Sequence, residues 1–148
     1  MKKLLYPLFT LLILFTVGCG DDDATDADPL VGVWEMKTVL MVFEDIGEGS
    51  PTITFNSDAD NNETMILVED GTYSSSGVSA LGAPPIGSFS KSGSWSATSN
   101  KLTIIEDGET KIFDFSISGR TLTLMRSDTY SDYLMEEDMI ITITYKKS

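Results

Sequence analysis

The side chains that most enzymes use for chemistry are scarce in this chain, apart from carboxylates. It contains no histidine and a single cysteine, Cys19, against 23 aspartate and glutamate residues. The absence of histidine excludes Ser-His-Asp and Cys-His nucleophilic arrangements and the usual imidazole ligands of catalytic zinc. Carboxylates alone could serve a glycosidase, which needs two of them at a defined separation, but no pair is singled out by its position. The sequence therefore predicts a protein that is not an enzyme and has no catalytic residues.

One acidic segment has the residue types of a calcium loop. Oxygen-bearing side chains alternate from Asp58 onward, and Glu69 stands where an EF-hand loop has its bidentate glutamate. The sixth position needs glycine for its sharp turn and holds Glu63 instead, and no flanking helices are predicted. An acidic solvated loop is the alternative, and we adopt it. We predict no metal and no cofactor.

The single cysteine follows an apolar N-terminal segment. Two lysines precede a nearly unbroken apolar run over residues 4–17, and Gly18 stands directly before Cys19. The run contains Pro7 and is short for a transmembrane helix, which needs roughly 20 apolar residues. The segment resembles a bacterial lipoprotein signal. That resemblance implies cleavage before Cys19 and acylation of its thiol and its new amino group.

The lipoprotein resemblance divides the chain into three parts. Residues 1–18 are the predicted signal peptide, residues 19–29 an acidic disordered tether, and residues 30–148 one folded domain. Acyl chains contribute about 0.8 kcal/mol per buried methylene, so a chain lipidated at Cys19 would stay on a membrane. Residues 21–23, three aspartates, resemble the acidic export signal of surface-displayed lipoproteins in some Gram-negative lineages, and a plain spacer is the alternative. We expect an outer membrane lipoprotein of the bacterial cell envelope, either surface-exposed or not.

Short β-type segments dominate the chain from residue 30 onward. Runs rich in β-branched and aromatic residues alternate with Gly, Asn, Asp and Ser at turn positions, and no amphipathic helix is evident. Tight turns at 69–71, 99–100, 107–108 and 118–119 predict antiparallel neighbours. We predict eight strands, over residues 31–43, 64–68, 72–76, 92–97, 101–106, 110–117, 121–126 and 139–145. The predicted loops are 44–63, with room for a short extra strand at 52–55, and 77–91.

Each predicted strand has one apolar face. Trp34, Met36 and Leu40 share one side of the first strand, and Phe113 and Phe115 share one side of a later one. A meander of eight half-buried strands hides these faces and removes its exposed edges by closing on itself. The sequence therefore predicts an all-β fold, an eight-stranded up-and-down antiparallel β-barrel.

The start of the first strand carries a family resemblance. Gly32 and Trp34 form a Gly-x-Trp motif, which at this position is a hallmark of lipocalins, and residues 69–73, 93–96 and 102–104 resemble the recurring pattern of the bacterial lipocalin-like lipoprotein family. The resemblance covers nearly the whole predicted domain. It implies a lipocalin-like barrel that binds or carries a small hydrophobic ligand.

The same resemblance implies a role for the tryptophan. In classical lipocalins it closes one end of the barrel and packs against an arginine or lysine from the end of the barrel sequence. Trp34 matches the first partner, and Arg126, Lys146 and Lys147 are the candidates for the second. The C-terminal helix of classical members is missing after the last predicted strand.

An eight-stranded barrel encloses enough space for packed side chains or for one small ligand. Ordinary core packing is the alternative to a binding site, because any apolar interior serves stability. The predicted ligand-binding residues are the inward-facing Trp34, Met36, Tyr73, Trp95, Phe113, Phe115, Leu124 and Tyr145.

Charge restricts the partners that this protein can have. The chain has a formal net charge of −13, and removal of residues 1–18 would take two lysines away. Nucleic acid is therefore an unfavourable partner. A basic protein would be attracted, so the alternative function is a protein-binding module of the cell surface, such as an inhibitor of a basic hydrolase. The expected partners are thus the membrane through Cys19, a small hydrophobic ligand, and a basic protein in the alternative.

Overall fold

The structure is a computed structural model that describes residues 28–44, 50–79, 87–131 and 136–148. The predicted signal peptide, Cys19 and most of the predicted tether lie outside the described residues. Within these ranges there is no helix, and so none long and apolar enough to cross a membrane. The described chain forms nine strands: β1 (Gly32–Phe43), β2 (Thr52–Asn56), β3 (Asn62–Leu67), β4 (Thr72–Ser79), β5 (Gly87–Ala97), β6 (Lys101–Glu106), β7 (Glu109–Ser118), β8 (Thr121–Ser131) and β9 (Glu136–Lys147).

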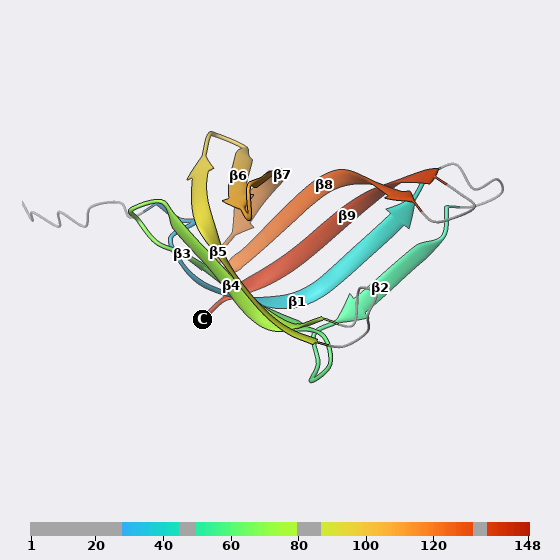
Figure 1. Ribbon diagram of the computed structural model, residues 1–148, viewed down its shortest axis with the longest axis horizontal. Coiled ribbons are helices and arrows are strands. Elements are labelled where there is room, and N and C mark those ends of the chain that lie inside the picture. Colours follow the sequence, from blue (N-terminus) through green and yellow to red (C-terminus); the bar gives the residue numbers. More distant parts are fainter. Residues whose placement is uncertain (1–27, 45–49, 80–86, 132–135) are drawn as a thin grey trace, which may run out of the picture.

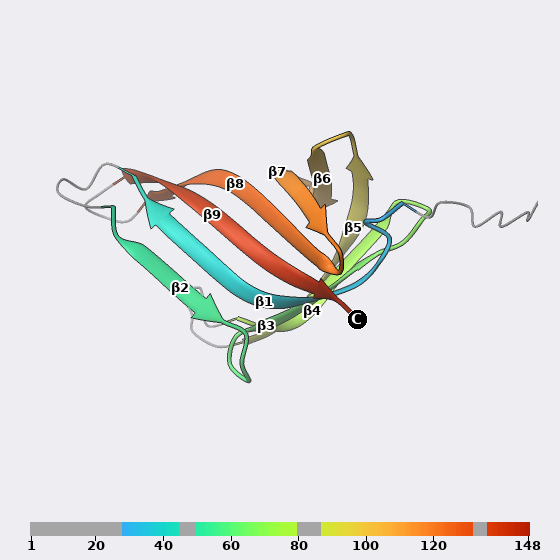
Figure 2. The same ribbon diagram turned by 180° about the vertical axis from the view of Figure 1, so that it is seen from behind.

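Eight of the nine strands close into a barrel (Figure 1). Each strand from β3 to β9 pairs antiparallel with the next, and β1 joins the two ends by pairing with β3 and with β9. β2 lies outside this ring, because it pairs with residues 38–42 of β1, beyond residues 32–35 that pair with β3. Figure 2 shows β2 along β1 on the side away from β9. The predicted all-β, up-and-down, eight-stranded barrel is confirmed.

The side chains of β1 that point into the barrel change from even-numbered to odd-numbered residues partway along the strand. The register of β1 against β9 shifts between Met36 and Thr38, which marks a β-bulge. Trp34 and Met36 face the interior as predicted, but beyond the bulge Val39 is buried, with 4% of its surface exposed. The prediction that Leu40 shares the inward face is wrong, because one extra residue moves every later side chain to the other face.

Several strands are longer than predicted. β4 and β5 pair up to Ser79 and Gly87, so much of the predicted loop 77–91 is sheet. β2 forms where the sequence left room for a short extra strand, at 52–55, and β8 and β9 pair beyond their predicted ends. Serine and glycine hid the extensions of β4 and β5, because both have low strand propensity and only pairing with a neighbour makes them sheet. The predicted turns at 69–71, 99–100 and 107–108 are confirmed, and the turn predicted at 118–119 lies at 119–120. Gly71, Asp107, Gly108 and Gly119 have positive φ in three of these turns.

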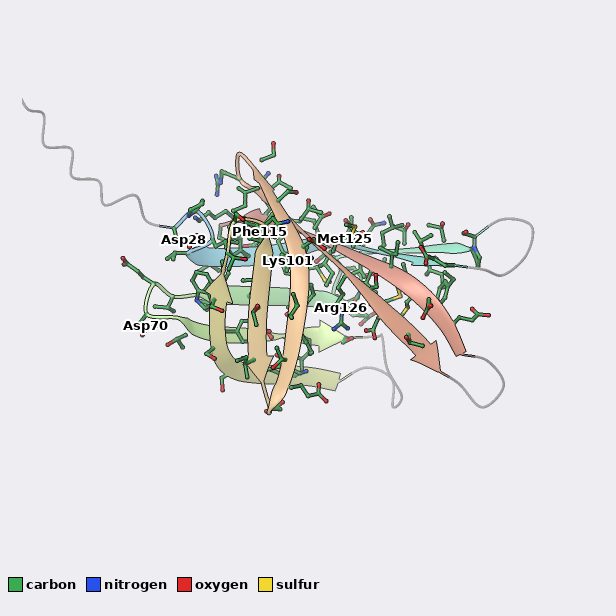
Figure 3. All side chains as sticks on the ribbon, turned by 90° about the horizontal axis from the view of Figure 1, so that it is seen from above. Asp28, Asp70, Lys101, Phe115, Met125 and Arg126 are labelled. Atoms are coloured by element: carbon green, nitrogen blue, oxygen red, sulfur yellow. The ribbon has the colours of Figure 1, made fainter. Side chains whose placement is uncertain are left out.

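One end of the barrel is filled by apolar side chains. Because neighbouring strands are antiparallel, the turns after β3, β5 and β7 lie at the same end of the barrel as the residues that precede β1. Figure 3 places Asp28 and Asp70 at this end of the long axis. We call it the closed end. Among its fully buried side chains, none more than 1% exposed, are Leu30, Trp34, Leu67, Leu102 and Leu122.

Candidate functional site

The other half of the barrel contains a cavity of about 440 Å³. The barrel wall around this cavity is lowest at the β6–β7 hairpin, which turns at Asp107 and Gly108, whereas the neighbouring strands extend further. Among the described residues, β5 pairs with β6 only from Gly93 onward, and β8 pairs with β7 only up to Met125. The longer strands continue past this hairpin, so the cavity opens beside its tip. Arg126, the first residue of β8 beyond the β7 pairing, lies at this opening (Figure 3).

The predicted ligand-binding residues divide into two groups in the structure. Five of them line the cavity: Met36, Tyr73, Phe113, Leu124 and Tyr145. The other three, Trp34, Trp95 and Phe115, are not among the described residues that line it. The apolar lining also includes side chains that the sequence did not single out: Val39, Met41, Met65, Val78, Phe89, Ile104, Ile141 and Ile143.

Trp34 plugs the closed end instead of facing the cavity. Its side chain is 0% exposed, and its indole Nε1 donates a hydrogen bond of 2.7 Å to the carbonyl of Leu30. The ammonium of Lys147 lies 5.2 Å from the centre of the Trp34 ring and donates to the carbonyl of Pro29 at 3.1 Å. Of the three candidates for the basic partner, the structure therefore selects Lys147.

The glycine of the Gly-x-Trp motif makes room for that partner. A Cβ at Gly32 would lie 2.6 Å from Cε of Lys147, closer than carbon atoms approach without a shift. The φ of Gly32 is also +144°, which side chains rarely adopt. The motif thus lets the lysine cross the start of β1 and reach the tryptophan ring.

Trp95 and Phe115 support the barrel from partly buried positions. Both pack against the core cluster. The indole Nε1 of Trp95 donates to the carbonyl of Val68 at 2.8 Å and so ties β5 to the end of β3. These contacts give the two aromatic side chains a structural role.

A first polar network lies inside the cavity, on β3, β4 and β9. The hydroxyl of Tyr145 donates to Oε2 of Glu63 at 2.8 Å, and the hydroxyl of Tyr73 donates to Oγ of Ser75, also at 2.8 Å. Burial raises the pKa of Glu63, although hydrogen bonds from Tyr145 and Ser75 act in the opposite direction. Burial and the nearby charge of Glu63 raise the pKa of Tyr145 as well.

A second polar network lies at the tip of the β6–β7 hairpin. The side chain of Glu106 is 3% exposed, and its Oε1 accepts hydrogen bonds from Lys91, at 3.0 Å, and from Lys111. Burial opposes ionisation of Glu106, but the hydrogen bonds and charges of the two lysines outweigh it and lower the pKa of this carboxyl. The network joins β5, β6 and β7 at the mouth of the cavity.

The two networks meet at a glycine. Gly93 pairs with Tyr73 on one side and with Glu106 on the other, so it stands between them in the same row of the sheet. A Cβ at Gly93 would lie 1.9 Å from the carbonyl oxygen of Ile105, which no real side chain could tolerate. Without that side chain, Tyr73 and Glu106 face each other directly. Burial, with smaller contributions from the charges of Glu63 and Glu106, raises the pKa of Tyr73.

Arg126 spans the mouth between β8 and β7. Its guanidinium carbon lies 5.6 Å from the centre of the Phe113 ring, within range of a cation–π interaction. The same guanidinium binds Oδ2 of Asp128 at 2.5 Å. The contact of Arg126 with Phe113 joins β8 to β7 just where the backbone pairing of these two strands ends.

The calcium-like segment does not form one loop. Asp58 lies in the turn before β3, where its Oδ1 accepts hydrogen bonds from the backbone of Asp60 and Asn61 at 2.9 and 2.8 Å. Glu69 lies in the turn after β3, about 20 Å further along at 3.3 Å per strand residue. Glu63 points into the barrel. Within the described part of the chain, no group of three or more histidine, cysteine, aspartate or glutamate residues could hold a metal ion.

Sequence comparison agrees with the resemblance inferred from the motifs. The chain matches the family described as "Lipocalin-like domain" over residues 30–124, from the residue that caps the closed end to the middle of β8. No match was found among curated proteins or among solved structures. The family match covers more than half of the 148 residues. The chain therefore belongs to the lipocalin-like domain family.

Proposed function

We propose that this protein binds a small hydrophobic molecule in its barrel while a lipid at Cys19 holds it in the bacterial cell envelope. The cavity supports the first part: about 440 Å³, lined mainly by apolar side chains, lies within the range of roughly 300–1,000 Å³ typical of small-molecule sites. Membership of the family suggests hydrophobic ligand binding in general and favours a binding protein over an enzyme. Apolar burial, at about 25 cal/mol per Å², would supply most of the affinity.

A cavity-filling substitution tests the ligand site. All nine strands lie between residues 32 and 147, so a chain without residues 1–18 keeps the whole barrel. We expect it to bind the neutral fluorescent probe N-phenyl-1-naphthylamine, and Val39→Phe to weaken that binding by roughly tenfold, because the new ring would occupy the cavity. Val39 lines the cavity, whereas Val42 on the same strand does not, so Val42→Phe is the matched control. Equal probe binding by both variants would contradict the site.

The lipid anchor is tested separately in living bacteria. The full chain should fractionate with membranes and incorporate labelled palmitate. Cys19→Ala should do neither, because the thiol that accepts the lipid is gone. A Cys19→Ala protein that still labels and stays on membranes would contradict the anchor without affecting the ligand site.

A further inference from the structure

Three basic side chains gather at the mouth of the cavity in an otherwise acidic protein. Lys91, Lys111 and Arg126 all line it, and their side chains are 38%, 25% and 27% exposed. Among the described residues that line the cavity, the carboxylates are Glu63 and Glu106. The chain as a whole carries a net charge of −13. Positive charge is thus concentrated where a ligand would enter, against the overall balance of the molecule.

The two lysines share one buried ion-pair partner. Both ammonium groups bind the same atom, Oε1 of Glu106, so one negative charge serves two positive ones. Each ammonium has three donors, and its contact with Glu106 uses one of them. The carboxylate is almost fully buried, whereas the lysines reach the mouth. Glu106 therefore holds the two lysines side by side at the opening, where two ammonium groups face one buried carboxylate. The other carboxylates that act on Lys91, Asp107 and Glu109, lie at the exposed tip of the hairpin, where water screens their charge.

The guanidinium of Arg126 is compensated from outside the cavity. Its partner Asp128 has a side chain that is 38% exposed and does not line the cavity, and water screens such a pair. Arg126 also stacks on Phe113, at the boundary between the charged mouth and the apolar lining. An anionic group at the mouth would lie near all three cations, with apolar side chains directly beneath it.

On the basis of the proposed ligand binding, we propose that the ligand is an amphipathic anion. Its head, a carboxylate or another group with anionic oxygens, binds Lys91, Lys111 and Arg126, and its apolar chain lies in the cavity against Phe113 and the aliphatic lining. A cationic head would be repelled by these three side chains. An uncharged head would leave their excess charge uncompensated.

A head-group comparison tests this on the unmodified barrel. The bound N-phenyl-1-naphthylamine is displaced with four compounds that share one apolar chain: laurate, lauryl phosphate, monolaurin and laurylamine. We expect both anions to displace the probe at roughly tenfold lower concentration than monolaurin, because a charge-assisted contact is worth about one such factor, with laurylamine weakest. Displacement by laurate but not by lauryl phosphate would restrict the head to a carboxylate. Monolaurin or laurylamine equal to or better than both anions would overturn the inference. The proposed function would still stand if the probe binds, and would fall only if the probe does not bind.

Two pairs of variants assign the effect to the mouth. Lys111→Met should weaken laurate binding severalfold more than monolaurin binding. Its control is Lys101→Met, since Lys101 also pairs with a carboxylate, Asp114 at 2.7 Å, but does not line the cavity. Glu106→Gln should strengthen laurate binding severalfold, because it leaves both lysines without a charged partner.

The control for that gain is Glu109→Gln, which removes an equal charge from an exposed position paired with Glu106 across the hairpin. A gain of function cannot come from a damaged fold. If Glu106→Gln does not fold, the Lys111→Met and Lys101→Met pair decides. The inference would be overturned if Lys111→Met bound laurate as tightly as Lys101→Met, or if a folded Glu106→Gln bound it no more tightly than Glu109→Gln.

Discussion

The closed end and the cavity half of the barrel are built from the same strands but filled differently. At the closed end, Leu30, Trp34 and Leu122 are at most 1% exposed and fill the interior. In the cavity half, the same strands leave about 440 Å³ unfilled and carry Glu63 and Glu106 inward. Burying carboxylates costs free energy unless they are hydrogen-bonded, and an unfilled cavity forgoes packing. The contrast teaches that the packed core is concentrated at one end of this barrel, whereas the other end gives up packing for a cavity with a partly polar lining.

The largest effect should come from removing the plug of the closed end. Trp34→Ala is expected to lower the free energy of unfolding by about 3–5 kcal/mol, because a fully buried ring and its hydrogen bond to Leu30 are lost together. Trp95→Ala is the matched control: its indole also donates to a backbone carbonyl, but its side chain is only partly buried. Urea unfolding of both variants measures the difference. Equal losses would show that the closed end is not the main source of stability.

The plug and its motif were largely predictable from the sequence. Gly32 and Trp34 are neighbours in the chain, and alternation assigns Trp34 an inward face without reference to any distant residue. The sequence left three candidates for the basic partner, because their side chains all come from the ends of later strands. Choosing Lys147 required the register of β9 against β1, which pairs Lys147 with Trp34.

The polar interior was predictable only in part. Glu106 has the same parity as Leu102 and Ile104, and Lys111 the same parity as Phe113, so alternation within the predicted strands could have placed both inside. Lys91 and Glu63 fell in predicted loops and carried no such signal. The bulge in β1 gave no local sign either, because it depends on how β9 pairs with that strand. The inward direction of these side chains therefore depends on pairing between distant strands, which the local sequence pattern does not contain.

A smaller effect, confined to the cavity half, should appear in the pH dependence of stability. Burial raises the pKa of Glu63 above its ordinary value of 4.5, so the folded chain holds that proton more tightly than the unfolded chain. Its contribution to stability is then fully present below pH 4.5 and is lost as the pH rises through the raised pKa. Glu63→Gln cannot titrate, so its stability relative to the parent should increase between pH 4 and 7.

The control for this pH effect lies at the other end of the same strand. Glu69→Gln removes an equal charge from an exposed turn, and urea unfolding across the pH range compares the two variants. If the relative stability of Glu63→Gln stays constant with pH, or if Glu69→Gln reproduces its change, the buried carboxyl is not the cause. Among the residues that the structure describes, the closed end contributes no carboxylate to the fully buried core, so this pH dependence distinguishes the two regions.

The smallest expected effect concerns the cation at the closed end. Lys147→Met keeps an aliphatic chain over Gly32 but loses the charge above Trp34 and the hydrogen bond to Pro29, which together should cost about 0.5–1 kcal/mol. Lys146→Met, on the neighbouring residue, removes the same charge from an exposed position and is the control. If the two variants unfold at the same urea concentration, the cation adds nothing beyond the packing of its chain. The stability of the closed end would then come from apolar burial and the indole hydrogen bond of Trp34 without help from a charge, which sharpens its contrast with the charged mouth at the other end.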